Sequence, residues 1–265
     1  MDDLYRWRED YVKNAAPLMI WHVWQLARHT ENPVSPWDAL DRYADIYRLS
    51  TRSEKIDPTV PGFSDPEWDE LKRRIIAIFE KHVTTLDSQA LEAECMALLW
   101  PLMKVRIKAD SRPHPPRAHG SWLRDIDGQF IKLHISNAAL PNSPFDDKLG
   151  MASDLLRLLL DTKAEHPSVT HVRCGTWLNN LPIFLSLFPP SWAASKSDVI
   201  ELGRGLGLWG QYMDRTGAFH SKNAQTFRAT GRHPFFYVTC HCEYSEAIAH
   251  LERMKVIGDT NAQLV

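Results

Sequence analysis

The sequence predicts an α+β or α/β fold in which a helical N-terminal part precedes an α/β part with a mixed sheet. In residues 1–107, apolar side chains recur at helical spacing behind capping residues. In residues 121–265, β-rich runs alternate with amphipathic helical runs. Residues 108–120 hold three prolines and show no periodicity, so we expect them to connect the two parts.

Capping residues and apolar stripes define the expected N-terminal helices. Ser35 and Asp65 each stand before a proline, which places a capping side chain ahead of proline at the first helical position. A later helix should kink or end near Pro101, because proline lacks a backbone donor. Residues 11–27 are apolar on more than one side, which predicts a central, buried helix.

The C-terminal part begins with an expected β-hairpin. Two alternating runs, at 121–124 and 129–135, flank the turn dipeptide Asp127-Gly128. The elements expected after it are a helix at 149–163, a strand at 169–177, a short helix at 180–188, strands at 199–202 and 235–242, and a helix at 246–254.

Composition narrows the classes of function. The chain has 265 residues and a net charge of −2, so no broad positive field is available for nucleic acid. No signal-peptide pattern and no apolar run long enough for a bilayer is found, so we expect a cytoplasmic protein that does not bind membranes. Four cysteines without framework spacing are expected to be reduced thiols.

One glycine-bearing segment stands where a strand is expected to give way to a leucine-rich helix. Residues 147–152 read Asp-Lys-Leu-Gly-Met-Ala, and a strand and an apolar stretch led by Asn180 follow. Over roughly residues 147–192 the chain resembles the GNAT acyltransferase superfamily, whose pyrophosphate loop has Arg or Gln at the first position. The resemblance implies a GNAT-like sheet and acyl-CoA as cofactor. The amides that would then hold the diphosphate belong to Lys148, Leu149, Gly150, Met151 and Ala152.

Three polar residues are candidates for catalysis. His134 and Asn137 lie at the end of the second expected hairpin strand, where polar groups are well placed for a site, and His134 could deprotonate an amine. A satisfied, buried histidine is the structural alternative. Ser186 supplies the hydroxyl where the GNAT family often has a tyrosine, whereas Asp147 replaces the family's basic or amide residue.

A second glycine-rich segment, residues 203–210, matches G-x-G-x-x-G in its last six positions and also resembles the first motif of S-adenosylmethionine methyltransferases. A dinucleotide site also needs an acidic residue about 20 positions on, and Asp214 is too close and Glu243 too far. Too few residues follow Gly207 to complete a methyltransferase fold in the usual order. Nearby basic residues form a candidate anion site for a small substrate, and salt-bridged surface residues are the alternative reading. The substrate-binding candidates are Arg204, Arg228 and Arg232.

No metal site is expected. Cys240 and Cys242 would lie on one face of a strand with His241 on the other, and two thiolates do not complete a zinc site.

Together these patterns favour an acyl-CoA-dependent N-acyltransferase acting on a small-molecule amine. One alternative is a cofactor-free lyase or transferase acting on a small anionic substrate through His134, Asn137 and the arginines. Another is a non-catalytic partner protein that exposes its tryptophans. The sequence leaves the oligomeric state open.

Overall fold

The computed structural model describes residues 2–29, 31–51, 58–60, 63–84, 88–110 and 119–262. It confirms the α+β class, with helices in the N-terminal part and a five-stranded mixed sheet in the C-terminal part. The chain divides into two compact units: unit 1 contains Met1–Pro113 and Leu202–Pro234, and unit 2 contains His114–Glu201 and Phe235–Val265. Residues 111–118 of the expected connection lie outside the described residues.

Unit 1 is built mainly from helices. From the N-terminal part they are α1 (Asp2–Arg28), α2 (Pro36–Arg42), α3 (Ile46–Ser50), α4 (Pro66–Lys81) and α5 (Ser88–Asp110). Later in the chain come α9 (Leu206–Trp209), the short helix η3 (Gly210–Tyr212) and α10 (Ser221–Thr230). The expected central helix is confirmed, because the middle of α1 is buried in the core of this unit.

Two cap predictions turned out differently. The Asp65 carboxylate accepts hydrogen bonds from the backbone N–H groups of Glu67 and Trp68, as its position before Pro66 predicts. Ser35 precedes α2 but makes no side-chain cap bond. We expected a helix to kink or end near Pro101, and the structure shows that it does not end there. Helix α5 continues through this exposed proline, because buried apolar residues on both sides keep it packed.

Unit 2 contains the sheet, in the order β1-β2-β3-β5-β4. Its strands are β1 (Trp122–Asp127), β2 (Phe130–Ile135), β3 (His171–Thr176), β4 (Ser197–Ile200) and β5 (Tyr237–Glu243). Its helices are η1 (Pro144–Asp147), α6 (Lys148–Glu165), η2 (Trp177–Asn180), α7 (Pro182–Leu185), α8 (Pro190–Ala194) and α11 (Tyr244–Ala262). The expected hairpin at Asp127-Gly128 is confirmed.

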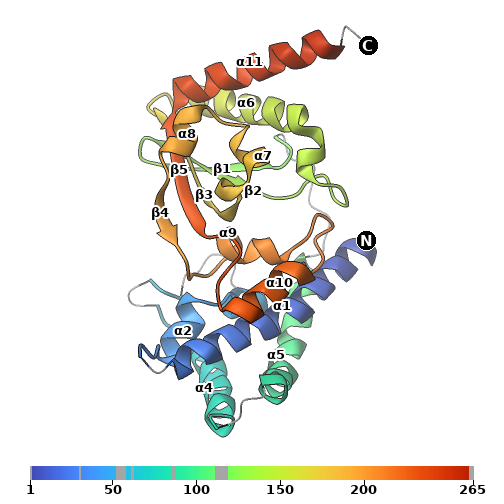
Figure 1. Ribbon diagram of the computed structural model, residues 1–265, viewed down its shortest axis with the longest axis vertical. Helices are drawn as coiled ribbons and strands as arrows, with labels where there is room; N and C mark the ends of the chain where they lie inside the picture. The colour runs from blue at the N-terminus through green and yellow to red at the C-terminus, as the bar shows by residue number, and fades with distance from the viewer. Residues whose placement is uncertain are drawn as a thin grey trace. The chain divides into compact units, whose positions relative to one another are not determined.

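The two faces of the sheet differ. Helices α6 and α11 pack side by side, and their apolar residues share a core with the inward side chains of the strands (Figure 1). We call the opposite face of the sheet the polar face. It carries Asp125, Lys132, His134, Arg173 and Thr239, which alternate with buried neighbours along their strands.

The segment Leu202–Pro234 differs from the domain division that the sequence suggested. We expected all of residues 121–265 to form the α/β part, but this segment lies between β4 and β5 in the chain and belongs to unit 1. The reason is its aromatic residues, because Trp209, Tyr212 and Phe227 are fully buried in the same core as α1. We call Leu202–Pro234 the inserted segment.

Candidate functional site

The parallel pair of strands in unit 2 separates before either strand ends. Strand β2 leads through α6 to β3, and the ladder between them joins residues 130–132 to residues 171–173 only. Beyond that point, residues 133–135 remain paired with β1, and residues 174–176 with β5. Residues 133–135 of β2 and 174–176 of β3 therefore lie beyond the ladder that joins the two strands. We call this place the β2–β3 opening.

The hydrogen-bond alternation shows which backbone groups face this opening. In an antiparallel pair, residues that exchange hydrogen bonds alternate with residues that face away. Ser136 N donates to Ser121 O at 2.9 Å, so Leu133 and Ile135 direct their N–H and C=O groups away from β1, toward β3. His241 N donates to Ser195 Oγ at 2.8 Å instead of to β3, so by the same alternation Gly175 faces β2.

Helix α6 begins at the end of the sheet where the ladder opens. Trp122, the direct cross-strand partner of Ile135, donates from its indole Nε1 to the carbonyl oxygen of Met151 at 2.9 Å. This bond fixes the first turn of α6 beside the start of β1, at the same end of the sheet as the opening. The opening and a helix N-terminus, where backbone N–H groups favour an anion, therefore lie at one end of the sheet.

A tyrosine phenol covers the strand at this opening. A Cβ atom added to Gly175 would lie 1.7 Å from the hydroxyl oxygen of Tyr237, so the phenol rests against the glycine backbone on the polar face. The pKa of Tyr237 is raised, because the effect of burial is larger than that of a hydrogen bond from Thr239, which lowers the pKa. The phenol is therefore protonated at neutral pH and can donate a proton.

His134 lies on the polar face of β2 and pairs with a carboxylate. Its Nε2 is 2.8 Å from Asp125 Oδ2, and 42% of the His134 side chain is exposed. The alternative of a buried histidine is therefore wrong. If the β2–β3 register continued, His134 would stand opposite Gly175, so His134 and Tyr237 flank the same opening. Asp125 holds Nε2 and leaves Nδ1 as the ring nitrogen for a further proton.

The first turn of α6 carries its own acidic cap. Asp147 Oδ1 accepts the N–H of Gly150 at 2.8 Å, and a Cβ at Gly150 would lie 2.1 Å from Asp147 Oδ2. One of the amides expected to bind a diphosphate is thus already bonded. Met151 and Ala152 are buried, whereas Leu149 is exposed and Lys148 is half-buried.

Two of the predicted catalytic residues stabilise local turns. Asn137 donates from Nδ2 to the carbonyl of Asn142 and accepts the N–H of Ala139, which closes the loop after β2. The Ser186 hydroxyl donates to the carbonyl of Ile183 at the end of α7. The hydrogen bonds described for Asn137 and Ser186 are therefore local ones.

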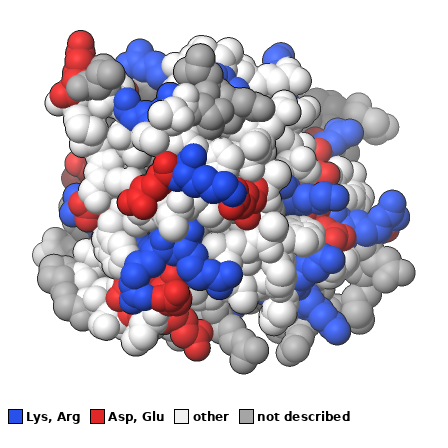
Figure 2. Space-filling model, turned by 90° about the horizontal axis from the view of Figure 1, so that it is seen from below, with Lys and Arg blue, Asp and Glu red and all other residues white. Residues whose placement is uncertain are grey.

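The three predicted substrate-binding arginines belong to unit 1, whereas His134 belongs to unit 2. Arg228 forms a two-pronged ion pair with Glu92 at 2.8 and 2.9 Å and lies over the Trp21 ring. Figure 2 shows the same mixing of signs, because on the face in view lysines and arginines lie beside aspartates and glutamates. The contacts of Arg228 match the salt-bridged reading.

The glycine-rich segment at 203–210 lacks the geometry of a nucleotide loop. Strand β4 before it pairs antiparallel with β5, and the helix after Gly205 has four residues. A dinucleotide site needs a parallel strand–helix–strand unit, so this geometry does not favour a dinucleotide-binding loop here. The indole N–H of Trp209 instead donates to the carbonyl of Gly203 at 3.0 Å.

The described cysteines lie in apolar cores. Cys240 and Cys242 are buried on one face of β5 with His241 exposed on the other, as predicted. Burial raises the pKa of Cys240 to about 11 and that of Cys242 to about 12. Across the described part of the chain, no three His, Cys, Asp or Glu side chains gather closely enough to hold a metal ion. None of its helices is long and apolar enough to cross a membrane.

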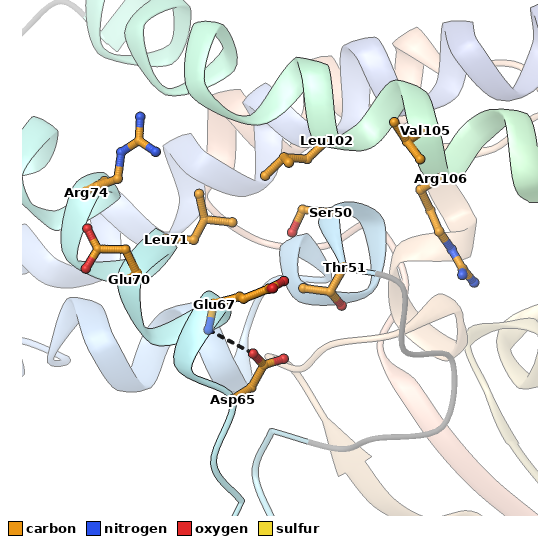
Figure 3. A pocket seen from close by; sticks show the side chains of 10 residues that line it. All are labelled: Ser50, Thr51, Asp65, Glu67, Glu70, Leu71, Arg74, Leu102, Val105 and Arg106. Atoms are coloured by element: carbon orange, nitrogen blue, oxygen red, sulfur yellow. Dashed lines mark hydrogen bonds between the residues drawn. The ribbon is translucent and has the colours of Figure 1, made fainter.

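Unit 1 has a pocket of about 610 Å³ between α3, α4 and α5. Figure 3 shows Leu71 and Leu102 pointing into it, with acidic side chains of α4 along one wall and an arginine toward each end. Asp65, one of the acidic residues, already caps α4 and accepts the Tyr47 hydroxyl at 3.1 Å. None of the predicted site residues lines this pocket.

Sequence reasoning missed Tyr237 and Gly175. Tyr237 lies inside the strand expected at 235–242, and Gly175 lies inside the strand expected at 169–177, where an isolated glycine signals a close approach by another group. That glycine was the available signal, but the sequence could not show which side chain approaches it.

Comparisons of the chain with family models, with curated proteins and with solved structures found no match.

Proposed function

We propose that this protein is an acyl-CoA-dependent N-acyltransferase and that its site lies at the β2–β3 opening of unit 2. One observation carries the proposal. The parallel strands joined by α6 part after three residue pairs, and α6 begins at the parted end. Backbone groups that point into the opening and a helix N-terminus then lie at the same end of the sheet, and acyl-CoA has an extended chain with two amides and a diphosphate to match them.

The strand edges can hold the extended part of the cofactor. Leu133, Ile135 and Gly175 direct backbone donors and acceptors toward the opening, and an extended chain of amides binds such edges as an added strand. The diphosphate would lie at the α6 N-terminus, served by the amides that Asp147 does not use and by Lys148. Bound acyl-CoA supplies an activated thioester carbonyl.

The side chains at the opening provide acid–base chemistry. An amine must lose a proton to attack a carbonyl, and His134 Nδ1 can accept it while Asp125 holds Nε2. The Gly175 N–H faces the opening and can donate to a developing oxyanion. Tyr237, protonated at neutral pH, can donate a proton to a departing thiolate.

Turnover tests the proposal. We expect thiol release from acetyl-CoA that depends on an added small primary amine, measured with a thiol reagent. His134→Gln should reduce this rate by about 100-fold, the usual size of general-base catalysis. The matched control is His171→Gln, because His171 also lies on the polar face but its Nδ1 bonds Thr170. Equal rates for the two variants, or release without amine dependence, would overturn the proposed roles.

The two alternatives lack a specific observation in their favour. A cofactor-free enzyme would need the arginines beside His134, whereas Arg228 is engaged by Glu92 within unit 1. A partner protein that binds through exposed tryptophans fits less well, because all ten tryptophans are buried or half-buried.

A further inference from the structure

Aromatic packing holds the inserted segment on α1. Trp209 and Phe227 from the inserted segment lie 5.7 Å apart, edge to face, and the Phe227 ring lies 5.5 Å from Trp21 of α1. The Tyr11 hydroxyl of α1 donates to the carbonyl of Trp209 at 3.3 Å. The inserted segment makes a further bond to α1 where Phe219 N donates to Asp10 Oδ2 at 2.8 Å, whereas the buried contacts named above are between uncharged rings.

Two histidines stand inside this aromatic cluster, one from each side. His22 comes from α1 and His233 from the end of the inserted segment, and each is 3% exposed. Their ring centroids are 5.8 Å apart. His233 also stacks on Phe227 at 4.4 Å and meets the Trp209 ring edge to face at 5.1 Å.

The protein provides little to stabilise a charge on either ring. The Tyr212 hydroxyl lies 2.7 Å from His233 Nδ1, but neither His22 Nε2 nor His233 Nε2 has a hydrogen-bond partner in the described part of the protein. A protonated imidazole has two N–H donors. Protonation would therefore leave at least one buried, charged donor without an acceptor on each ring, at high cost.

The titratable neighbours do not offset this cost. Tyr212 of η3 contacts His233 and lies near Tyr11 of α1, and burial raises the pKa of both phenols. On α10 the charged residue beside Phe227 is Arg228, whose guanidinium is engaged by Glu92. Burial lowers the pKa of His22 to about 4 and that of His233 to about 3, where the proximity of His22 also contributes.

We infer that an uncharged histidine pair, His22 and His233, holds the inserted segment on α1, and that mild acid releases the segment. The inference is independent of the proposed acyltransferase activity. The direction follows from linkage: the released histidines take up protons below pH 6.5, whereas the docked histidines do not until pH falls to about 4. Docking is therefore at full strength above pH 6.5 and weakens progressively between pH 6.5 and 4.

The expected size of the effect can be calculated. Between pH 7.5 and 5.5, protonation of a group with an ordinary pKa of about 6.5 favours the released state by about tenfold. Two such histidines give about 100-fold. The chain returns from the inserted segment to unit 2 at Phe235, two residues after His233, so release would also free the chain that leads into β5.

Hydrogen exchange of the full-length protein, read by mass spectrometry and corrected for the intrinsic pH dependence of exchange, tests the inference. The exchange of α10 should rise by about 100-fold from pH 7.5 to 5.5, while that of α4 changes less than threefold. His233→Asn keeps an acceptor for Tyr212, and His22→Leu fills the same core. Each variant should reduce the ratio to about tenfold, and the double variant should reduce it below threefold.

The control is His241→Gln, since His241 is an exposed histidine of unit 2, and it should keep the 100-fold ratio. Each ratio is taken within one variant, so a general loss of stability does not mimic the result. Three outcomes would overturn the inference: a wild-type ratio below threefold, a rise in α4 equal to that in α10, or a double variant that keeps the full ratio.

Discussion

Asp147 offers the sharpest test of how an anion would be held in unit 2. Its carboxylate accepts the Gly150 N–H at 2.8 Å and so caps α6, but its charge also opposes a diphosphate at the same helix end. Asp147→Asn keeps the cap oxygen and removes the charge. Because Asn and Asp are equally good caps, the free energy of unfolding should change by less than about 0.5 kcal/mol.

The gain in affinity follows from the lost repulsion. One carboxylate about 6 Å from two phosphate charges, at the water-like dielectric of an exposed site, costs about 1.4 kcal/mol, and salt screening at 0.15 M reduces this to about 0.7 kcal/mol. Asp147→Asn should therefore bind acetyl-CoA about threefold more tightly. The gain should be larger in 50 mM than in 300 mM salt.

Isothermal titration with acetyl-CoA at the two salt concentrations measures this effect. Urea unfolding of the same variant is the control for the cap. Affinity that is unchanged or weaker at both salt concentrations, with stability intact, would refute the placement of the diphosphate at this helix end.

Two further predictions concern stability. The Lys72 side chain is 3% exposed and its ammonium lies 2.9 Å from Asp41. In urea unfolding, Asp41→Ala should lower the free energy of unfolding by about 3 kcal/mol, whereas Lys72→Met should lower it by less than about 1 kcal/mol. Similar losses for the two variants would contradict this. Gly175→Ala should cost about 2 kcal/mol, because its Cβ would meet the Tyr237 hydroxyl, and adding Tyr237→Leu should recover most of that loss. Additive losses in the double variant would rule out the contact.

Local signals predicted the elements of the fold better than their assembly. The Asp65 cap and the Asp127-Gly128 turn depend on neighbours in the chain, so the sequence was sufficient for them. The inserted segment was assigned to the wrong part because an apolar pattern shows which side of a helix is buried and not which core buries it. Pro101 similarly lies within a helix that tertiary packing maintains.

The candidate site was predicted in part. His134 was identified from its place after an expected strand, but its partner Asp125 depends on strand register. Asp147 was seen only as a repulsive charge, although it is also the cap of α6. Tyr237 could not be found from the sequence, because its neighbour Gly175 lies more than 60 residues earlier in the chain.

The binding of acyl-CoA to the intact protein tests the central claim most directly. The measurement is the free energy of unfolding in urea, with and without acetyl-CoA at 100 times the dissociation constant found by titration. A ligand that binds only the folded protein should add about 2.7 kcal/mol at that concentration. No saturable binding by titration, and an unfolding free energy unchanged by millimolar acetyl-CoA or longer acyl-CoA thioesters, would contradict the acyltransferase account.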